Sequence, residues 1–226
     1  YRDRDRWSAE DAPFRLGISP IKPKFDYILQ SWDTAISDEP TAAYSACTTW
    51  GVWGEKSEDE LFRMMLLSSW RGRVGYPELR SRAQRLAKDY KDIGEHKNPI
   101  PAQRTVDCCL IEAKATGDPL IRDLRLGGIP AIGYVPKGDK NARVQRAAPF
   151  IECGLVYLPT EEKNPERLTP MAEEFLETVI TFPNGESKDL VDSMTQAILY
   201  LRDFDALTHT SDVKEDETIT KFRKLY

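Results

Sequence analysis

The segment FDYILQSWDTAISDEPTAAYSACTTWGVW, residues 25–53, predicts two neighbouring strands at the centre of a β-sheet. Its first part, Phe25–Asp33, is enriched in aromatic and β-branched residues and carries apolar side chains in both phases of a strand's alternation. A strand with this pattern is buried on both faces of its sheet. The polar turn at residues 37–40 then leads into a second apolar run, Tyr44–Trp53, so we expect the two strands to form a hairpin.

Asp33 ends the first strand and is the first candidate for a functional residue. A carboxylate at the tip of a buried strand costs desolvation free energy unless the group is hydrogen-bonded, paired or bound to a cation. Asp33 could therefore cap the turn by bonding to its own backbone, or it could belong to a charged site. The positions of the other acidic residues bear on this choice.

The composition is that of an ordinary globular protein. The chain has 226 residues, of which 40% are hydrophobic and 31% are charged, and its formal net charge is -5. This acidic balance argues weakly against a protein that coats nucleic acid, although it leaves room for a local basic groove. No apolar run has membrane-spanning length and no signal peptide is recognisable, so no membrane partner is expected.

The cysteine and histidine content argues against a zinc site. None of the four cysteines forms a C-x-x-C pair, and the two histidines, His96 and His209, are not near a cysteine in the sequence. Three of the four cysteines lie in apolar runs, which predicts reduced residues of the core. The P-loop pattern of ATP-binding proteins does not occur in the sequence.

Beyond the hairpin, the hydrophobic pattern changes from the period of strands to that of helices. A third apolar run, Leu61–Trp70, completes a predicted antiparallel meander. Further strands are predicted at Val106–Ile111, Ile129–Val135 and Leu155–Leu158. Helices are predicted at Pro77–Tyr90, Gly117–Leu126, Asp139–Cys153, Pro170–Thr181 and about Lys188–Arg202, the last with Ser187 as its N-cap. The predicted fold class is α/β, with a mixed sheet of three antiparallel strands followed by parallel crossovers, flanked by helices.

The same pattern divides the chain into three parts. Residues 1–24 are polar, contain three prolines, and are interpreted as a linker or arm that leads into the domain. Residues 25–207 form the predicted domain. The charged residues 208–226 are predicted to form a loosely attached tail.

Four acidic residues are candidates for one site. Asp33 and Glu112 each end a predicted strand, and functional sites in open α/β sheets form at the carboxyl ends of strands. If these strands are neighbours, the two carboxylates meet, and like charges held this close repel unless a cation lies between them. Asp189 and Asp192 lie three residues apart at the start of the last helix, on a face away from its apolar stripe. They are either solvated acids that interact with the helix dipole or further members of the site.

A site of carboxylates without histidine or cysteine favours Mg²⁺ or Mn²⁺ over zinc. Paired divalent ions can clamp the attacking and leaving oxygens of a phosphodiester, which makes nucleic-acid hydrolysis a candidate reaction. Phosphate contacts are expected from basic residues in the same part of the sequence: Lys114, Lys137, Lys140, Arg143 and Arg146. Lys114 could equally face solvent. At helical spacing the last three share a face, which could equally be a solvated basic surface.

Seven segments, taken in order, resemble the C-terminal nuclease domain of the large terminase subunit of tailed bacteriophages and prophages. They are SWDTA at residues 31–35, TTWGVW at 48–53, IEAKATG at 111–117, DLRLGGIP at 123–130, PKGDKNAR at 136–143, GLVYLP at 154–159 and FPNGESKDLVDS at 182–193. The resemblance covers residues 25–202 and implies an RNase H-like fold. It also implies a metal-dependent endonuclease that cuts concatemeric viral double-stranded DNA during genome packaging, in the cytoplasm of the infected bacterial host.

The resemblance also implies roles for individual residues. It implies two ions, Mg²⁺ or Mn²⁺, held by four acids: Asp33, Glu112, Asp189 and Asp192. The first three of these are implied to be the catalytic carboxylates. Asp139, Lys140 and Arg143 match a further family segment, and we assign them to DNA or phosphate contact. Lys188 and Ala113 stand where family members often carry further ligands, so this chain departs from the family pattern at two positions.

The implied partners are double-stranded DNA, a terminase ATPase domain to which residues 1–24 would connect, the small terminase subunit and the portal. Two other hypotheses stay open. One is an RNase H-like module that docks to the portal or motor without binding metal, which the two departures support. The other is a junction-resolvase-like or transposase-like nuclease of the same fold.

Overall fold

The computed structural model describes most of the predicted domain. The described residues are 25–35, 43–54, 62–88, 90–91, 103–104, 106–113, 117–161, 163–185 and 188–203. The predicted arm at residues 1–24, the predicted tail at 208–226, Lys114 and the predicted N-cap Ser187 lie outside these residues.

A six-stranded mixed sheet forms the centre of the described structure, in the order β7-β6-β1-β2-β3-β8. Its strands are β1 (Tyr27–Asp33), β2 (Ser45–Gly54), β3 (Phe62–Gly72), β6 (Cys108–Glu112), β7 (Ala131–Tyr134) and β8 (Val156–Tyr157). β1, β2 and β3 pair antiparallel, whereas β6 pairs parallel with both β1 and β7, and β8 pairs parallel with β3. This arrangement confirms the predicted RNase H-like sheet of an antiparallel meander followed by parallel crossovers.

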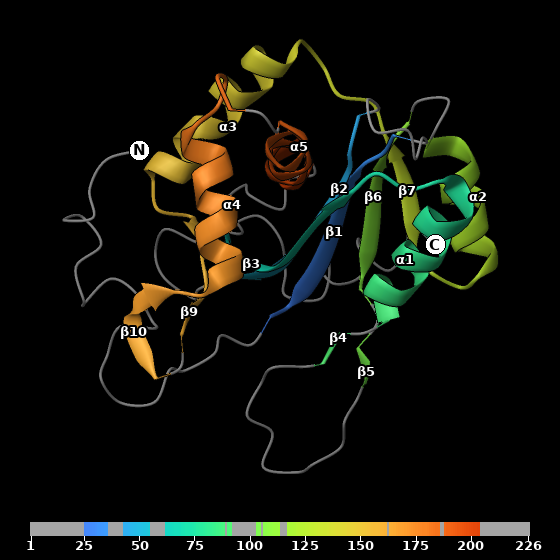
Figure 1. Cartoon of the computed structure of the whole chain (residues 1–226), viewed down its shortest axis with the longest axis horizontal. Coiled ribbons are helices and arrows are strands. Elements are labelled where there is room, and N and C mark those ends of the chain that lie inside the picture. The colour runs from blue at the N-terminus through green and yellow to red at the C-terminus, as the bar shows by residue number, and fades with distance from the viewer. Residues whose placement is uncertain are drawn as a thin grey trace, which may run out of the picture.

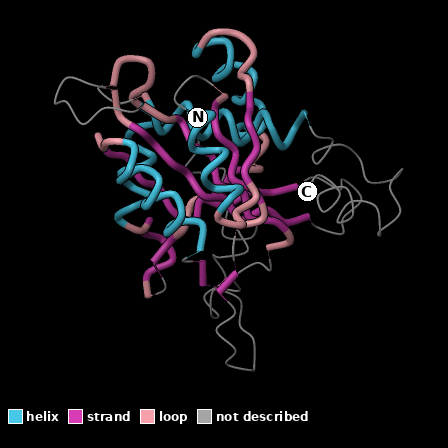
Figure 2. The backbone as a smooth tube through the Cα atoms, turned by 90° about the vertical axis from the view of Figure 1, so that its right-hand side faces the viewer, coloured by secondary structure: helices cyan, strands magenta, loops and turns pink. Residues whose placement is uncertain are grey.

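Five helices cover the two faces of this sheet in the described part of the chain. They are α1 (Tyr76–Lys88), α2 (Gly117–Leu126), α3 (Lys140–Glu152), α4 (Pro170–Ile180) and α5 (Asp189–Asp203). Figure 1 shows α1 and α2 on one side of the sheet and α3, α4 and α5 on the other. Figure 2 shows the strands running through the middle of the molecule, with helices packed around them. Each face therefore has its own hydrophobic core.

Two small hairpins were not predicted from the sequence. β4 (Tyr90–Lys91) pairs with β5 (Gln103–Arg104), and β9 (Thr160–Glu161) pairs with β10 (Asn164–Leu168). These segments are polar, so the alternation of apolar residues that reveals a strand in the sequence is missing from them. None of the described helices has the length and the apolar character needed to cross a membrane.

Helix α5 is the most deeply buried helix of the described structure. Every residue from Leu190 to Leu201 is buried, because the helix lies between the sheet and the helices α3 and α4 (Figure 1). The sequence left open whether the face opposite the apolar stripe is solvated or belongs to a site, and the burial of Asp192 and Gln196 excludes a solvated face at these residues. A helix covered on all sides must satisfy its polar side chains within the protein.

A polar seam, formed by Ser31, Thr48, Ser193 and Gln196, provides these partners between α5 and the sheet. The hydroxyl groups of Ser31 and Ser193 each donate to the other residue's carbonyl oxygen at 2.8 Å. The Oγ1 of Thr48 lies 2.7 Å from the Oγ of Ser193. Gln196 donates from Nε2 to Ser31 Oγ and to the carbonyl oxygens of Trp32 and Leu110 at 3.2, 3.3 and 3.4 Å. The seam thus ties α5 to three adjacent strands.

The close packing of Gly117 against Glu112 generates a prediction. A Cβ atom on Gly117, the first residue of α2, would lie 2.1 Å from the backbone oxygen of Glu112. We expect Gly117→Ala to lower the free energy of unfolding by about 1–3 kcal/mol, because the end of β6 must move to relieve the overlap. Differential scanning calorimetry of both proteins measures the change.

Gly54→Ala is the matched control, since a Cβ there meets only the Phe62 ring, at 3.5 Å. We expect this variant to change the stability by less than about 0.5 kcal/mol. Equal losses in the two variants would contradict the role given to Gly117.

Candidate functional site

The strand register brings Asp33 and Glu112 together. β1 and β6 pair in parallel, with Ser31 opposite Leu110 and Trp32 opposite Ile111, so continuing the register places Asp33 beside Glu112. Side chains alternate between the faces of a strand. Leu110 packs in the core that includes α5, so Glu112, two residues later, lies on the same face. The two acids that end predicted strands therefore meet under the start of α5.

The carboxyl groups of Asp33 and Glu112 lie close enough to interact. Glu112 is only 5% exposed. The pKa of Asp33 is raised from 3.8 to about 7, mainly by burial, then by the negative charges of Asp192 and Glu112 and by the hydrogen bond to Glu112. Lys140 opposes this shift.

The first turn of α5 adds Asp189 and Asp192 to the site. Asp192 is 5% exposed and points into the protein, whereas the sequence placed both acids on a face away from the buried stripe. Burial raises the pKa of Asp189, Lys140 opposes the change, and the charge of Asp192 adds to it. Asp33, Glu112, Asp189 and Asp192 together are called the acidic cluster below.

Two cations from α3, which lies on the same side of the sheet as α5, reach the acidic cluster. Nη2 of Arg143 lies 2.7 Å from Oδ1 of Asp192, and Nη1 lies 4.0 Å from Oε1 of Glu112. Lys140 donates from Nζ to the other oxygen of Asp192, Oδ2. Burial alone would lower the pKa of Lys140. The hydrogen bond to Asp192 and the charges of Asp192, Asp33 and Asp189 raise this pKa by more, so the net shift is upward.

The inward position of Arg143 excludes one of the two readings that the sequence left open for the basic residues of this helix, a solvated basic face that includes Arg143. Arg143 is 6% exposed and therefore cannot lie on a solvated surface with its neighbours. Arg146 is partly buried and approaches Asp203 at 3.9 Å, and Lys137 is exposed. The carboxylate of Asp139 accepts a hydrogen bond from the backbone N–H of Ala142 at 2.8 Å, which makes Asp139 the N-cap of α3. Lys137, Lys140 and Arg146 remain candidates for phosphate contacts.

The donor atoms of the acidic cluster suit a hard divalent cation. All of them are carboxylate oxygens, which Mg²⁺ and Mn²⁺ prefer. No group of three or more His, Cys, Asp or Glu side chains in the described part of the chain is already arranged to hold a metal ion. Both oxygens of Asp192 are bonded to protein cations, which leaves Asp33, Glu112 and Asp189 as the acids whose oxygens could turn toward an added ion.

The polar seam was missed by the sequence analysis. Ser193 directly follows Asp192, and Gln196 lies about one turn further along α5, so the seam holds the helix just behind its acids. The only sign of the seam in the sequence is that Ser193 and Gln196 are polar residues beside the apolar stripe of this helix. That signal does not distinguish an exposed face from a buried one.

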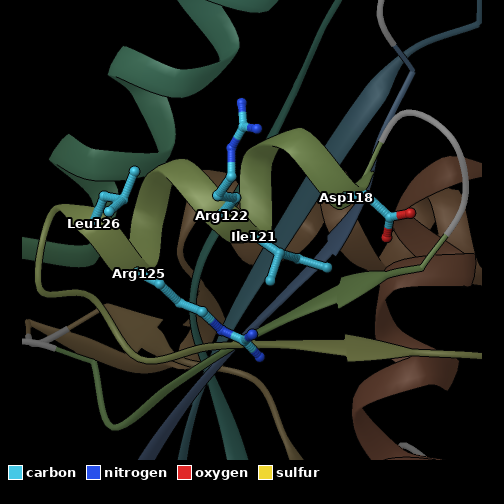
Figure 3. Close-up of a pocket in the computed structure, with 5 residues that line it drawn as sticks. All are labelled: Asp118, Ile121, Arg122, Arg125 and Leu126. Atoms are coloured by element: carbon cyan, nitrogen blue, oxygen red, sulfur yellow. The ribbon is translucent and has the colours of Figure 1, made fainter.

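A surface hollow among the described residues lies elsewhere, on the outer side of α2. It is lined by Asp118, Ile121, Arg122, Arg125 and Leu126. Figure 3 shows these side chains spread along the helix instead of converging on one point. Arg125 is held by its bond from Nε to the carbonyl oxygen of Ala131. We therefore assign the candidate chemistry to the acidic cluster and not to this hollow.

The sequence matches no protein-family model and no curated protein. Among solved structures, the chain is similar to the large terminase nuclease of thermophilic phage G20c. The structure with bound zinc has 15% identity and a TM-score of 0.45, and the match covers 76% of this chain and 79% of that chain. The structure with bound magnesium has 14% identity and a TM-score of 0.46, and the match covers 79% of this chain and 82% of that chain. RuvC of Thermus thermophilus has 11% identity and a TM-score of 0.42, and the match covers 81% of this chain and 97% of that chain. At these identities the likeness concerns the fold alone.

The raised pKa of Asp33 generates a prediction about stability. Between about pH 4 and pH 7 the folded protein holds a proton that the unfolded chain releases, so this group makes the fold less stable as pH rises. Asn at position 33 carries no charge and can donate to Glu112. We therefore expect Asp33→Asn, in EDTA, to raise the free energy of unfolding at pH 8 by about 1–3 kcal/mol.

Thermal unfolding at pH 8 and pH 4.5 measures this effect, and the gain should shrink at the lower pH. Asp139→Asn is the control, because asparagine caps a helix as well as aspartate does and Asp139 is exposed. A loss of stability in Asp33→Asn, or a gain of the same size at both pH values, would disprove the assignment.

Proposed function

We propose that this chain is a divalent-metal-dependent DNA endonuclease. The observation that carries the proposal is the contact between Asp33 and Glu112 at the carboxyl ends of two parallel neighbouring strands. Asp192 approaches this pair from the first turn of α5, and Asp189 lies near Asp192 and Lys140 in the same turn. Such a concentration of acids in one buried place is unfavourable for stability and is typical of a site that takes up cations.

The residues of the cluster have distinct tasks in this proposal. Asp33 and Glu112 hold Mg²⁺ or Mn²⁺ with Asp189, and Asp33 releases its proton when the ion binds. When bound, such ions supply the positive charge that stabilises the attacking and leaving oxygens of a phosphodiester. Arg143 keeps Asp192 and Glu112 in place from the buried side. Lys137, Lys140 and Arg146 contact the phosphates of the DNA backbone, and Lys114 could add to these contacts.

Contacts to phosphates carry no sequence information, so we expect cleavage with little sequence preference.

The seven motifs in order support a finer proposal, in which the chain is the nuclease domain of a large terminase subunit. Its substrate would then be concatemeric viral double-stranded DNA in the cytoplasm of the infected host. Its partners would be a terminase ATPase domain, the small terminase subunit and the portal.

Two alternatives are compatible with the same fold. A junction-resolvase-like nuclease would use the same carboxylates on branched DNA. A docking module without metal is favoured by one observation, the neutralisation of Asp192 by two protein cations. The substrate and the metal dependence of cleavage distinguish these alternatives.

The test is a plasmid-cleavage assay with the full chain in Mn²⁺, Mg²⁺ or EDTA. We expect nicking and linearisation of supercoiled plasmid with either metal and none in EDTA. Asp33→Asn should reduce the rate by at least about a hundredfold, because the residue is placed to hold the ion. Asp26→Asn is the matched control, since Asp26 is exposed and lies before the opposite end of β1.

Wild-type rates in Asp33→Asn would overturn the proposed active site. An absence of cleavage with both metals would favour the docking module. Faster cleavage of a four-way junction than of a linear duplex of the same length would favour the resolvase-like nuclease over the terminase.

A further inference from the structure

Positive charge is distributed unequally over the acidic cluster. Asp192 accepts a hydrogen bond from Arg143 on one oxygen and from Lys140 on the other. Glu112 approaches Nη1 of Arg143 at the longer distance of 4.0 Å and lies beside Asp33 on the neighbouring strand. Asp192 therefore already has the two positive neighbours that a carboxylate ligand would otherwise obtain from metal ions.

The two cations differ in how firmly they are held. The side chain of Arg143 is 7% exposed, and its Nε is buried without a hydrogen-bond partner among the described residues. Burying a guanidinium group with one unsatisfied N–H is unfavourable, so its ion pair with Asp192 must offset that cost. The side chain of Lys140 is 49% exposed and can move into solvent without a similar cost. Arg143 is thus a fixed cation and Lys140 a displaceable one.

A count of charges gives the number of divalent ions needed to neutralise the acidic cluster. Four ionised carboxylates with the charges of Lys140 and Arg143 leave two negative charges. One divalent ion balances these, whereas a second would leave an excess of two positive charges in a largely buried place. Arg71, which also acts on Asp189, does not change this count because it lies 3.6 Å from Glu174.

We propose that the acidic cluster binds one divalent ion tightly, at Asp33 and Glu112, and that Arg143 and Lys140 take the place of a second ion at Asp192. This inference rests on the proposed metal-dependent function and deepens it, because the terminase resemblance implies two ions. Lys140 and Arg143 are then positioning residues that hold Asp192 and supply fixed positive charge next to the bound ion.

The test counts bound ions and does not depend on cleavage. Mn²⁺ is titrated into the full chain at pH 8, with calorimetry for the affinity and electron paramagnetic resonance of free Mn²⁺ for the number bound. We expect one tight ion in the wild type. In Lys140→Gln, Asp192 loses one cation, and we expect a second ion to bind at least about tenfold more tightly than in the wild type.

Lys137→Gln is the matched control, because it removes the same charge from an exposed residue near α3 and should leave one tight ion. Asp33→Asn should remove that ion. Two tight ions in the wild type would overturn the inference and leave the metal-dependent nuclease standing. No tight ion in the wild type would overturn both, and an unchanged second-ion affinity in Lys140→Gln would overturn the role of Lys140.

Discussion

The docking of α5 against the centre of the sheet is the constraint on which the rest of the site depends. Apolar contacts alone would allow this helix to slide or rotate, because they are not directional. The polar seam removes that freedom, since Ser193 and Gln196 bond to particular atoms on β1, β2 and β6. Asp192 directly precedes the seam, so its position relative to Asp33 is fixed by hydrogen bonds one residue away.

The same docking creates the electrostatic problem that the site has to solve. Four carboxyl groups come together at one edge of the sheet, and burial weakens their hydration. The structure offsets this in two ways. Asp33 can hold a proton near neutral pH because its pKa is raised to about 7, and Asp192 is paired with cations from α3. The proton on Asp33 can be released when a cation binds, whereas the ion pair of Asp192 with the buried Arg143 is built into the fold. This difference is what separates the proposed ion site from the rest of the cluster.

The sequence predicted the large elements of the fold because their hydrophobic periods are clear. β1, β2, β3, β6 and β7 and all five helices lie where apolar residues repeat at strand or helix spacing. It also identified Asp33 and Glu112, since each acid ends a buried strand. The small hairpins β4–β5 and β9–β10 were missed because they are held by backbone pairing between polar segments. The spacing of apolar residues along the sequence does not reveal this kind of backbone pairing.

What the sequence by itself determined is which residues alternate along each strand and which helix faces are apolar, because these are local properties. From them follow the order of elements, the mixed sheet and the presence of two strand-end acids. Only the tertiary structure decided that Arg143 points inward, that α5 is covered on every side, and that Asp192 is buried with two cations. The physical reason is that burial and ion pairing depend on what packs against a residue, and for these residues the partners lie about 50 positions or more away in the chain.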